Sequence, residues 1–113
     1  MTIIYHNPRC SKSRETLALL EDREEEFKVV KYLENPPSAE ELREIVTLLG
    51  IKPIDLVRTQ EEVWKTRFAQ MPLSDDQVLE AMASHPRLIE RPIVIKGNKA
   101  AIGRPPQKII DIL

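Results

Sequence analysis

The sequence has very few soft metal ligands. Among 113 residues there is one cysteine, Cys10, and there are two histidines, His6 and His85. An internal disulfide and a zinc site with paired CxxC motifs are therefore excluded, and we expect no bound metal. The N-terminal residues lack the features of a secretory signal peptide. A free thiol in such a chain is typical of a reducing compartment, so we expect a cytoplasmic protein.

Aromatic residues, net charge and long apolar runs are also scarce. The chain has only five aromatic residues, and 17 Lys and Arg balance 18 Asp and Glu. Because a nucleic-acid-binding domain normally carries a basic excess and stacking aromatics, we expect no nucleic-acid partner. No run of 18 apolar residues is present, which predicts no membrane span. The length and the 42% hydrophobic content favour one domain, residues 1–113.

Turn residues divide the first third of the chain into strand, helix and strand patterns. Residues 2–5 form a short β-rich run that ends at the Asn7-Pro8 turn signal. A helix pattern starts at Ser11, with Ser11 or Ser13 as its expected N-cap, and fades within the charged residues 21–26. Residues 27–33 read as a second strand, parallel to the first because a helix connects them.

The middle of the chain has helix signals, and the last third has a hairpin. Two capping boxes, at residues 38–41 and 74–77, each open a helix, and Gly50 ends the first of these helices. Shorter helices are expected between them, at 53–58 and 61–70, and Pro86 stops the second long helix. The remaining expected elements are strands at 91–95 and 100–102, a turn between them, and a helix at 107–113.

This element order predicts an α/β fold. A βαβ half followed by a ββα half around one four-stranded mixed sheet is the thioredoxin-like arrangement. The helices around residues 38–84 would form an insertion between the two halves.

Cys10 is the residue most indicative of chemistry. It lies where the first strand, a turn and the first helix meet, so the helix N-terminus directs unpaired N–H groups and a positive dipole end toward its sulfur. Arg9, Lys12, Arg14 and His6 are close in sequence. These features lower the pKa of the thiol, and the same N–H groups can bind an oxyanion. We therefore expect a nucleophilic thiolate rather than a small buried residue.

The spacing around Cys10 excludes a dithiol redox mechanism and argues against a tyrosine-phosphatase mechanism. The segment Cys10-Ser11-Lys12-Ser13 is C-x-x-S, so a dithiol enzyme that resolves its own disulfide is excluded. A tyrosine-phosphatase loop needs C-x5-R, but position 16 is Thr.

An oxyanion beside a thiolate needs cationic partners. Arginine suits this role because its planar fork binds two oxygens at once. The candidates are Arg58, Arg91 and Arg104. Arg91 and Arg104 flank one hairpin and should lie at the same end of the sheet.

Four segments carry a resemblance to a known family. These are YHNPRCSKSRETL near the start, YLENPPS after the second strand, RPIVI at the third strand and GRPP near the end. In this order they resemble the glutaredoxin-coupled arsenate reductases, of which the chain looks like a short member. The resemblance extends from about Ile3 to Leu113.

The resemblance implies a function and a set of roles. Cys10 would attack arsenate, glutathione would add as co-substrate without any bound cofactor, and a glutaredoxin would reduce the adduct and release arsenite. Arg58, Arg91 and Arg104 would match the three oxyanion-binding arginines, and His6 the histidine that lowers the cysteine pKa. Pro92 would match the cis-proline that faces the cysteine in thioredoxin-like folds. The remaining expected supporting residues are Asn7, which shapes the loop, and Ser13 and Arg14 at the helix start.

Two other functions stay open on the sequence. Regulators that bind RNA polymerase share this fold, although they usually carry a C-x-x-C switch that Ser13 replaces here. A monothiol glutaredoxin-like carrier would fit C-x-x-S, but it would not need three oxyanion-binding arginines.

Overall fold

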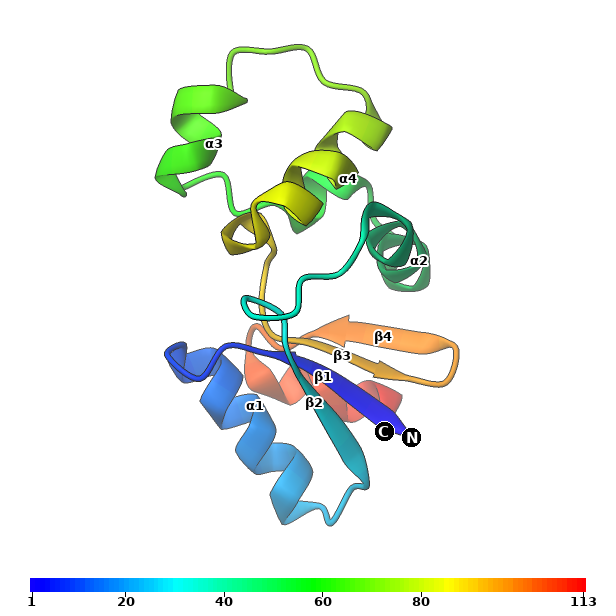
Figure 1. The fold of residues 1–113 in the computed structure, drawn as a ribbon. Coiled ribbons are helices and arrows are strands. Elements are labelled where there is room, and N and C mark those ends of the chain that lie inside the picture. Colours follow the sequence, from blue (N-terminus) through cyan, green and yellow to red (C-terminus); the bar gives the residue numbers. More distant parts are fainter. The chain divides into compact units, whose positions relative to one another are not determined.

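The computed structural model describes residues 1–113, which form a four-stranded sheet with helices between and after its strands (Figure 1). The strands are β1 (Thr2–His6), β2 (Phe27–Lys31), β3 (Ile93–Lys96) and β4 (Lys99–Ile102). The α-helices are α1 (Ser11–Asp22), α2 (Ala39–Leu49), α3 (Glu62–Arg67) and α4 (Asp75–Ser84). Three 3-10 helices complete the chain: η1 (Pro53–Leu56), η2 (Pro86–Leu88) and η3 (Pro106–Ile112).

The contacts group the chain into two compact units. Residues 1–35 and 91–113 form the first, which we call the sheet unit, and residues 36–90 form the second, the helical unit. The helical insertion expected around residues 38–84 falls inside the helical unit. That both units make one domain stays a prediction.

The sheet unit has the expected mixed topology. The strand order is β2-β1-β3-β4, with β1 and β2 parallel and the other neighbours antiparallel. Helix α1 provides the crossover that a parallel pair requires, and a tight turn at Gly97 joins β3 to β4. The predicted thioredoxin-like sheet is therefore confirmed.

The core of the sheet unit lies between the sheet and two helices. Ile4, Leu20, Val94 and Ile109 have no exposed side-chain surface. They come from β1, α1, β3 and η3, and α1 and η3 lie on the same face of the sheet (Figure 1). Burial of such side chains contributes about 1.5–3 kcal/mol each, which fixes α1 against the strands that carry the candidate site.

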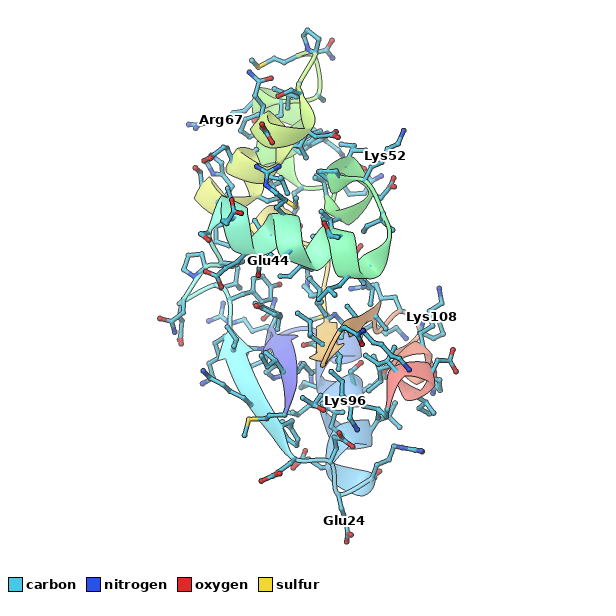
Figure 2. All side chains as sticks on the ribbon, turned by 90° about the vertical axis from the view of Figure 1, so that its right-hand side faces the viewer. Glu24, Glu44, Lys52, Arg67, Lys96 and Lys108 are labelled. Atoms are coloured by element: carbon cyan, nitrogen blue, oxygen red, sulfur yellow. The ribbon has the colours of Figure 1, made fainter.

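The helical unit is stabilised by capped helix ends and by apolar packing between α2 and α4. Ser38 and Ser74 form complete capping boxes, and Gly50 ends α2 in the left-handed conformation with φ of 69°. The buried residues of α2 face those of α4, while Glu44 and Arg67 lie on exposed faces (Figure 2). None of the helices combines the length and the apolar content that a membrane span needs.

Several predicted boundaries were wrong by a few residues. The second strand ends at Lys31 because residues 32–34 turn, and the third begins only after Pro92. The fourth begins at Lys99, and the helix expected at 61–70 spans only Glu62–Arg67. The elements at 53–58 and 107–113 are the 3-10 helices η1 and η3, both of which begin with a proline that cannot donate a backbone hydrogen bond.

Candidate active site

Cys10 occupies the junction between β1 and α1. Its backbone N–H donates to the Asn7 carbonyl oxygen at 3.0 Å, and the Asn7 side chain accepts a bond from the Arg9 N–H at 3.0 Å. Asn7 thus shapes the turn, as expected. Cys10 itself is the N-cap of α1, with extended backbone angles, and it is 8% exposed. The predicted cap at Ser11 or Ser13 was wrong, because the Ser13 side chain is bound elsewhere.

The surroundings of the sulfur favour the thiolate. Burial by itself raises the pKa of Cys10. The backbone N–H groups of Ser13 and Lys12 and the guanidinium of Arg91 lower the pKa by more than burial raises it, so the net shift is downward. The sulfur makes no regular capping hydrogen bond. The N–H groups of Ser13 and Lys12 belong to the first turn of α1, so the electropositive end of the helix faces the sulfur.

Arg91 and Arg104 meet at this sulfur. Nη2 of Arg104 lies 3.6 Å from Sγ of Cys10, and its Nε donates to the Arg91 carbonyl oxygen at 2.8 Å. Arg91 is the side chain whose hydrogen bond and charge lower the Cys10 pKa. The two residues that flank the hairpin therefore do lie at one end of the sheet. The Arg91–Pro92 bond is cis, as is the Arg104–Pro105 bond.

His6 is linked to Ser13 rather than acting as a cation. Its Nδ1 lies 2.7 Å from the Ser13 hydroxyl, which also accepts the Asn7 N–H at 3.0 Å. Burial, Lys31 and Arg14 lower the pKa of His6, so the ring is neutral near pH 7. A neutral ring can accept the Ser13 hydroxyl proton at Nδ1. The geometry thus gives His6, Asn7 and Ser13 a shared network that fixes the end of β1 to the first turn of α1.

Two of the cations near Cys10 in sequence, Lys12 and Arg14, have other partners. Nζ of Lys12 lies 3.6 Å from the Glu15 carboxylate, and Nη1 of Arg14 donates to the Pro8 carbonyl oxygen at 3.0 Å. Arg14 supports the turn. The distant residue Arg91, and not these neighbours, is the arginine that lowers the Cys10 pKa.

Arg58, the third predicted arginine, lies in the helical unit. Its Nη1 donates to Glu90 at 2.8 Å, and its Nε is 3.7 Å from the Glu61 carboxylate. The segments of Arg58 and Glu90 are held together by two backbone hydrogen bonds around the Val57–Ile89 bridge. Sequence reasoning did not find the role of Glu90. Its only sequence signal is its place beside Arg91.

The sheet unit therefore brings together a thiol of lowered pKa and two guanidiniums. A thiolate can act as a nucleophile, and the two guanidiniums supply positive charge and fixed N–H donors. This set suits attack on a tetrahedral oxyanion.

Comparison with known sequences gives consistent results. The sequence pattern of the ArsC family matches residues 5–112. The chain is 47% identical over 113 residues to an arsenate reductase of Haemophilus influenzae, covering 98% of this chain and 97% of that protein. It is 46% identical over 112 residues to the uncharacterized protein YfgD of Escherichia coli, covering 97% and 94%.

A solved structure has the same fold. The arsenate reductase from Vibrio cholerae is 49% identical to this chain. The two structures superpose with a TM-score of 0.95, and the match covers 99% of this chain and 97% of that one.

Proposed function

The chain belongs to the ArsC family, and from this premise we propose that it is an arsenate reductase whose nucleophile is Cys10. Relatives at 46–47% identity that carry the name arsenate reductase support the proposal. The single observation that carries it is the meeting of Arg104 and Arg91 at the Cys10 sulfur.

The first step needs a thiolate and an anion side by side. Arsenate is negatively charged at neutral pH, so it repels an attacking thiolate unless positive groups neutralise it. Arg91 and Arg104 would bind the arsenate oxygens, aided by the N–H groups at the start of α1. The Cys10 sulfur would then bond to As(V), and one arsenate oxygen would leave as water after protonation. The arsenic remains As(V) in this step, because one ligand is exchanged for another.

The reduction needs two electrons from outside the chain, because Cys10 is the only cysteine. In our proposal, glutathione displaces a second oxygen as water and forms a bond between its sulfur and the arsenic. A glutaredoxin thiolate attacks the glutathione sulfur and forms a mixed disulfide with it, so that the two thiols are oxidised. The sulfur–arsenic bond breaks, and its electron pair reduces the arsenic to As(III). Hydrolysis of the remaining Cys10–arsenic bond releases arsenite and restores the thiol.

The other predicted residues receive supporting roles in this proposal. His6, Asn7 and Ser13 hold the cysteine loop, Arg14 supports its turn, and Pro92 places Arg91. Arg58 is a third proposed oxyanion ligand, for which the Glu90 carboxylate competes with the substrate.

The test is a turnover assay with the full chain. Arsenite formation is followed with arsenate and glutathione, with a glutaredoxin or a thioredoxin as alternative reductants. We expect arsenite only with glutathione and a glutaredoxin, and none with Cys10→Ser. Turnover with thioredoxin alone would refute the proposed reductant.

The same material separates the other functions of this fold. Disulfide reduction without arsenate turnover would favour a monothiol carrier, and recovery of RNA polymerase in a pull-down without turnover would favour a regulator. Either result would overturn the enzymatic proposal.

A further inference from the structure

Gly103 lies where a larger residue has no room. It is buried between β4 and Arg104. A Cβ added to Gly103 would lie 2.5 Å from Oγ1 of Thr16 and 2.9 Å from Cγ of Pro92. Both distances are shorter than real Cβ contacts, so any other residue would force the segment or its neighbours to move.

Thr16 cannot easily give way. Its side chain is fully buried in α1, and its hydroxyl donates to the Lys12 carbonyl oxygen at 2.8 Å. Rotating the side chain would exchange the hydroxyl for the methyl group, which already lies 3.3 Å from the added Cβ. A Cβ at Gly103 would therefore move the segment of Gly103 and not the helix.

This segment carries both arginines of the candidate site. The Gly103 N–H donates to the Pro92 carbonyl oxygen at 2.9 Å, and Pro92 follows Arg91 directly. Arg104 follows Gly103, and its guanidinium bonds to the Arg91 carbonyl oxygen and reaches the Cys10 sulfur. The sulfur, in turn, stands at the start of α1, the helix that Gly103 touches six residues further along.

We propose that Gly103 is a positioning residue: because it has no side chain, the segment that carries Arg104 rests against Thr16 and brings the guanidinium to the Cys10 sulfur. The inference rests on the proposed role of Cys10 as nucleophile. In this proposal, the Thr16–Gly103 contact sets the distance between the start of α1 and the two arginines. A shift of about 1 Å in such a spacing is enough to weaken catalysis severely.

The experiment measures how Gly103→Ala changes the sulfur. Cys10 is the only thiol, so the rate of its alkylation by iodoacetamide against pH gives its pKa directly. In Gly103→Ala we expect the midpoint of this profile to move upward, because the guanidinium retreats from the thiolate. The kcat/KM for arsenate should fall by about tenfold or more.

Gly97→Ala is the matched control. Gly97 has a φ of 60° in the turn between β3 and β4, and an added Cβ would meet nothing within 4 Å. The substitution strains the turn and should lower the melting temperature. Its alkylation profile should stay that of the wild type, so a general loss of stability is distinguished from a displaced arginine.

Two more variants keep the proposal testable. In an Arg104→Ala background, Gly103→Ala should shift the profile less than in the wild type, because part of its effect passes through Arg104. Thr16→Val replaces the hydroxyl by a bulkier methyl and presses on the same contact from the helix side. It should give a smaller upward shift, and it decides the matter if Gly103→Ala does not fold.

An unchanged alkylation profile in folded Gly103→Ala, or in folded Thr16→Val where the first does not fold, would overturn the inference. This readout needs no arsenate. A wild type that fails to reduce arsenate while Gly103→Ala shifts the profile would refute only the proposed function. Normal turnover with an unmoved profile would refute only the positioning role.

Discussion

Arginines in the two units have different partners. In the sheet unit, Arg104 is held by a backbone carbonyl oxygen and faces the Cys10 sulfur at 3.6 Å. In the helical unit, Arg58 faces two carboxylates, with Glu90 at 2.8 Å and Glu61 at 3.7 Å. The neighbours of each arginine therefore determine how its guanidinium can interact with an anion. A carbonyl oxygen orients a guanidinium without cancelling its charge, whereas a carboxylate does both.

This comparison predicts unequal contributions to anion binding. A guanidinium that already has a close carboxylate must exchange it for a substrate oxygen, which reduces the net gain. Arg91 and Arg104, which act directly on the Cys10 sulfur, should therefore contribute most to anion binding, and Arg58 should contribute less. The following predictions test that order, starting from the change with the largest effect.

Cys10→Ser should abolish arsenate turnover. The hydroxyl is a far weaker nucleophile than a thiolate, but serine is a good N-cap residue, so the start of α1 should persist. Arsenite is measured with glutathione and a glutaredoxin present, and circular dichroism confirms the fold. Residual turnover above background in the serine variant would show that the sheet unit does not supply the nucleophile.

Arg91→Ala and Arg104→Ala should each lower kcat/KM for arsenate by about 100- to 1,000-fold. Both variants should also raise the pKa of Cys10, because each removes a positive group from the sulfur. Steady-state kinetics and iodoacetamide alkylation provide the two readouts. Arg43→Ala is a useful control, since its exposed pair with Asp76 belongs to the helical unit.

The pH dependence of alkylation should reveal the lowered pKa of Cys10. The rate should reach half its plateau at a lower pH than for a free thiol, and it should fall about tenfold per pH unit below that lowered pKa. A folded-state pKa below the unfolded one stabilises the fold fully above the unfolded thiol pKa of about 8.5. This stability is lost as the pH falls through the folded pKa. Denaturant titrations of the wild type and Cys10→Ser from pH 5 to 9 should diverge accordingly.

Arg58→Ala should lower kcat/KM by about tenfold at most, mainly through KM, because Glu90 and Glu61 already offset its charge. The same variant should leave alkylation of Cys10 unchanged. A loss as large as that of Arg104→Ala would break the contrast between the two units and place Arg58 among the principal ligands.

Ser74→Ala should have the smallest effect on the chemistry. It removes the hydroxyl that accepts the Gln77 N–H and so destabilises α4 by about 1 kcal/mol. Thermal melting should detect this loss, while the alkylation profile of Cys10 should match the wild type. A changed profile would mean that the helical unit tunes the thiol.

Local signals explain why much of the sheet unit could be predicted. The Asn7-Pro8 turn, the strand before it and the helix after it place Cys10 at a helix start. The hairpin between Arg91 and Arg104 brings their backbones together by topology alone. Each of these inferences uses residues that are close in sequence or joined by one short turn.

The contacts that could not be predicted join residues that are far apart in sequence, or depend on which of several nearby acceptors a side chain binds. Thr16 and Gly103 lie 87 positions apart, and no sequence pattern in either segment predicts their contact. Glu90 pairs with Arg58 across 32 positions. Lys12 and Arg14 were expected to help lower the Cys10 pKa, but their side chains contact the Glu15 carboxylate and the Pro8 carbonyl oxygen. Proximity in sequence therefore overestimated the role of neighbouring cations.

The place of Cys10 as the N-cap of α1 couples the chemistry to the helix. Whenever its sulfur forms a covalent bond, the negative charge facing the first turn disappears, and the amides of Lys12 and Ser13 lose an attractive partner. Each modified form of the enzyme should thus exchange these amide protons faster than the resting thiolate, which makes the helix start a gauge of where the protein stands in its cycle.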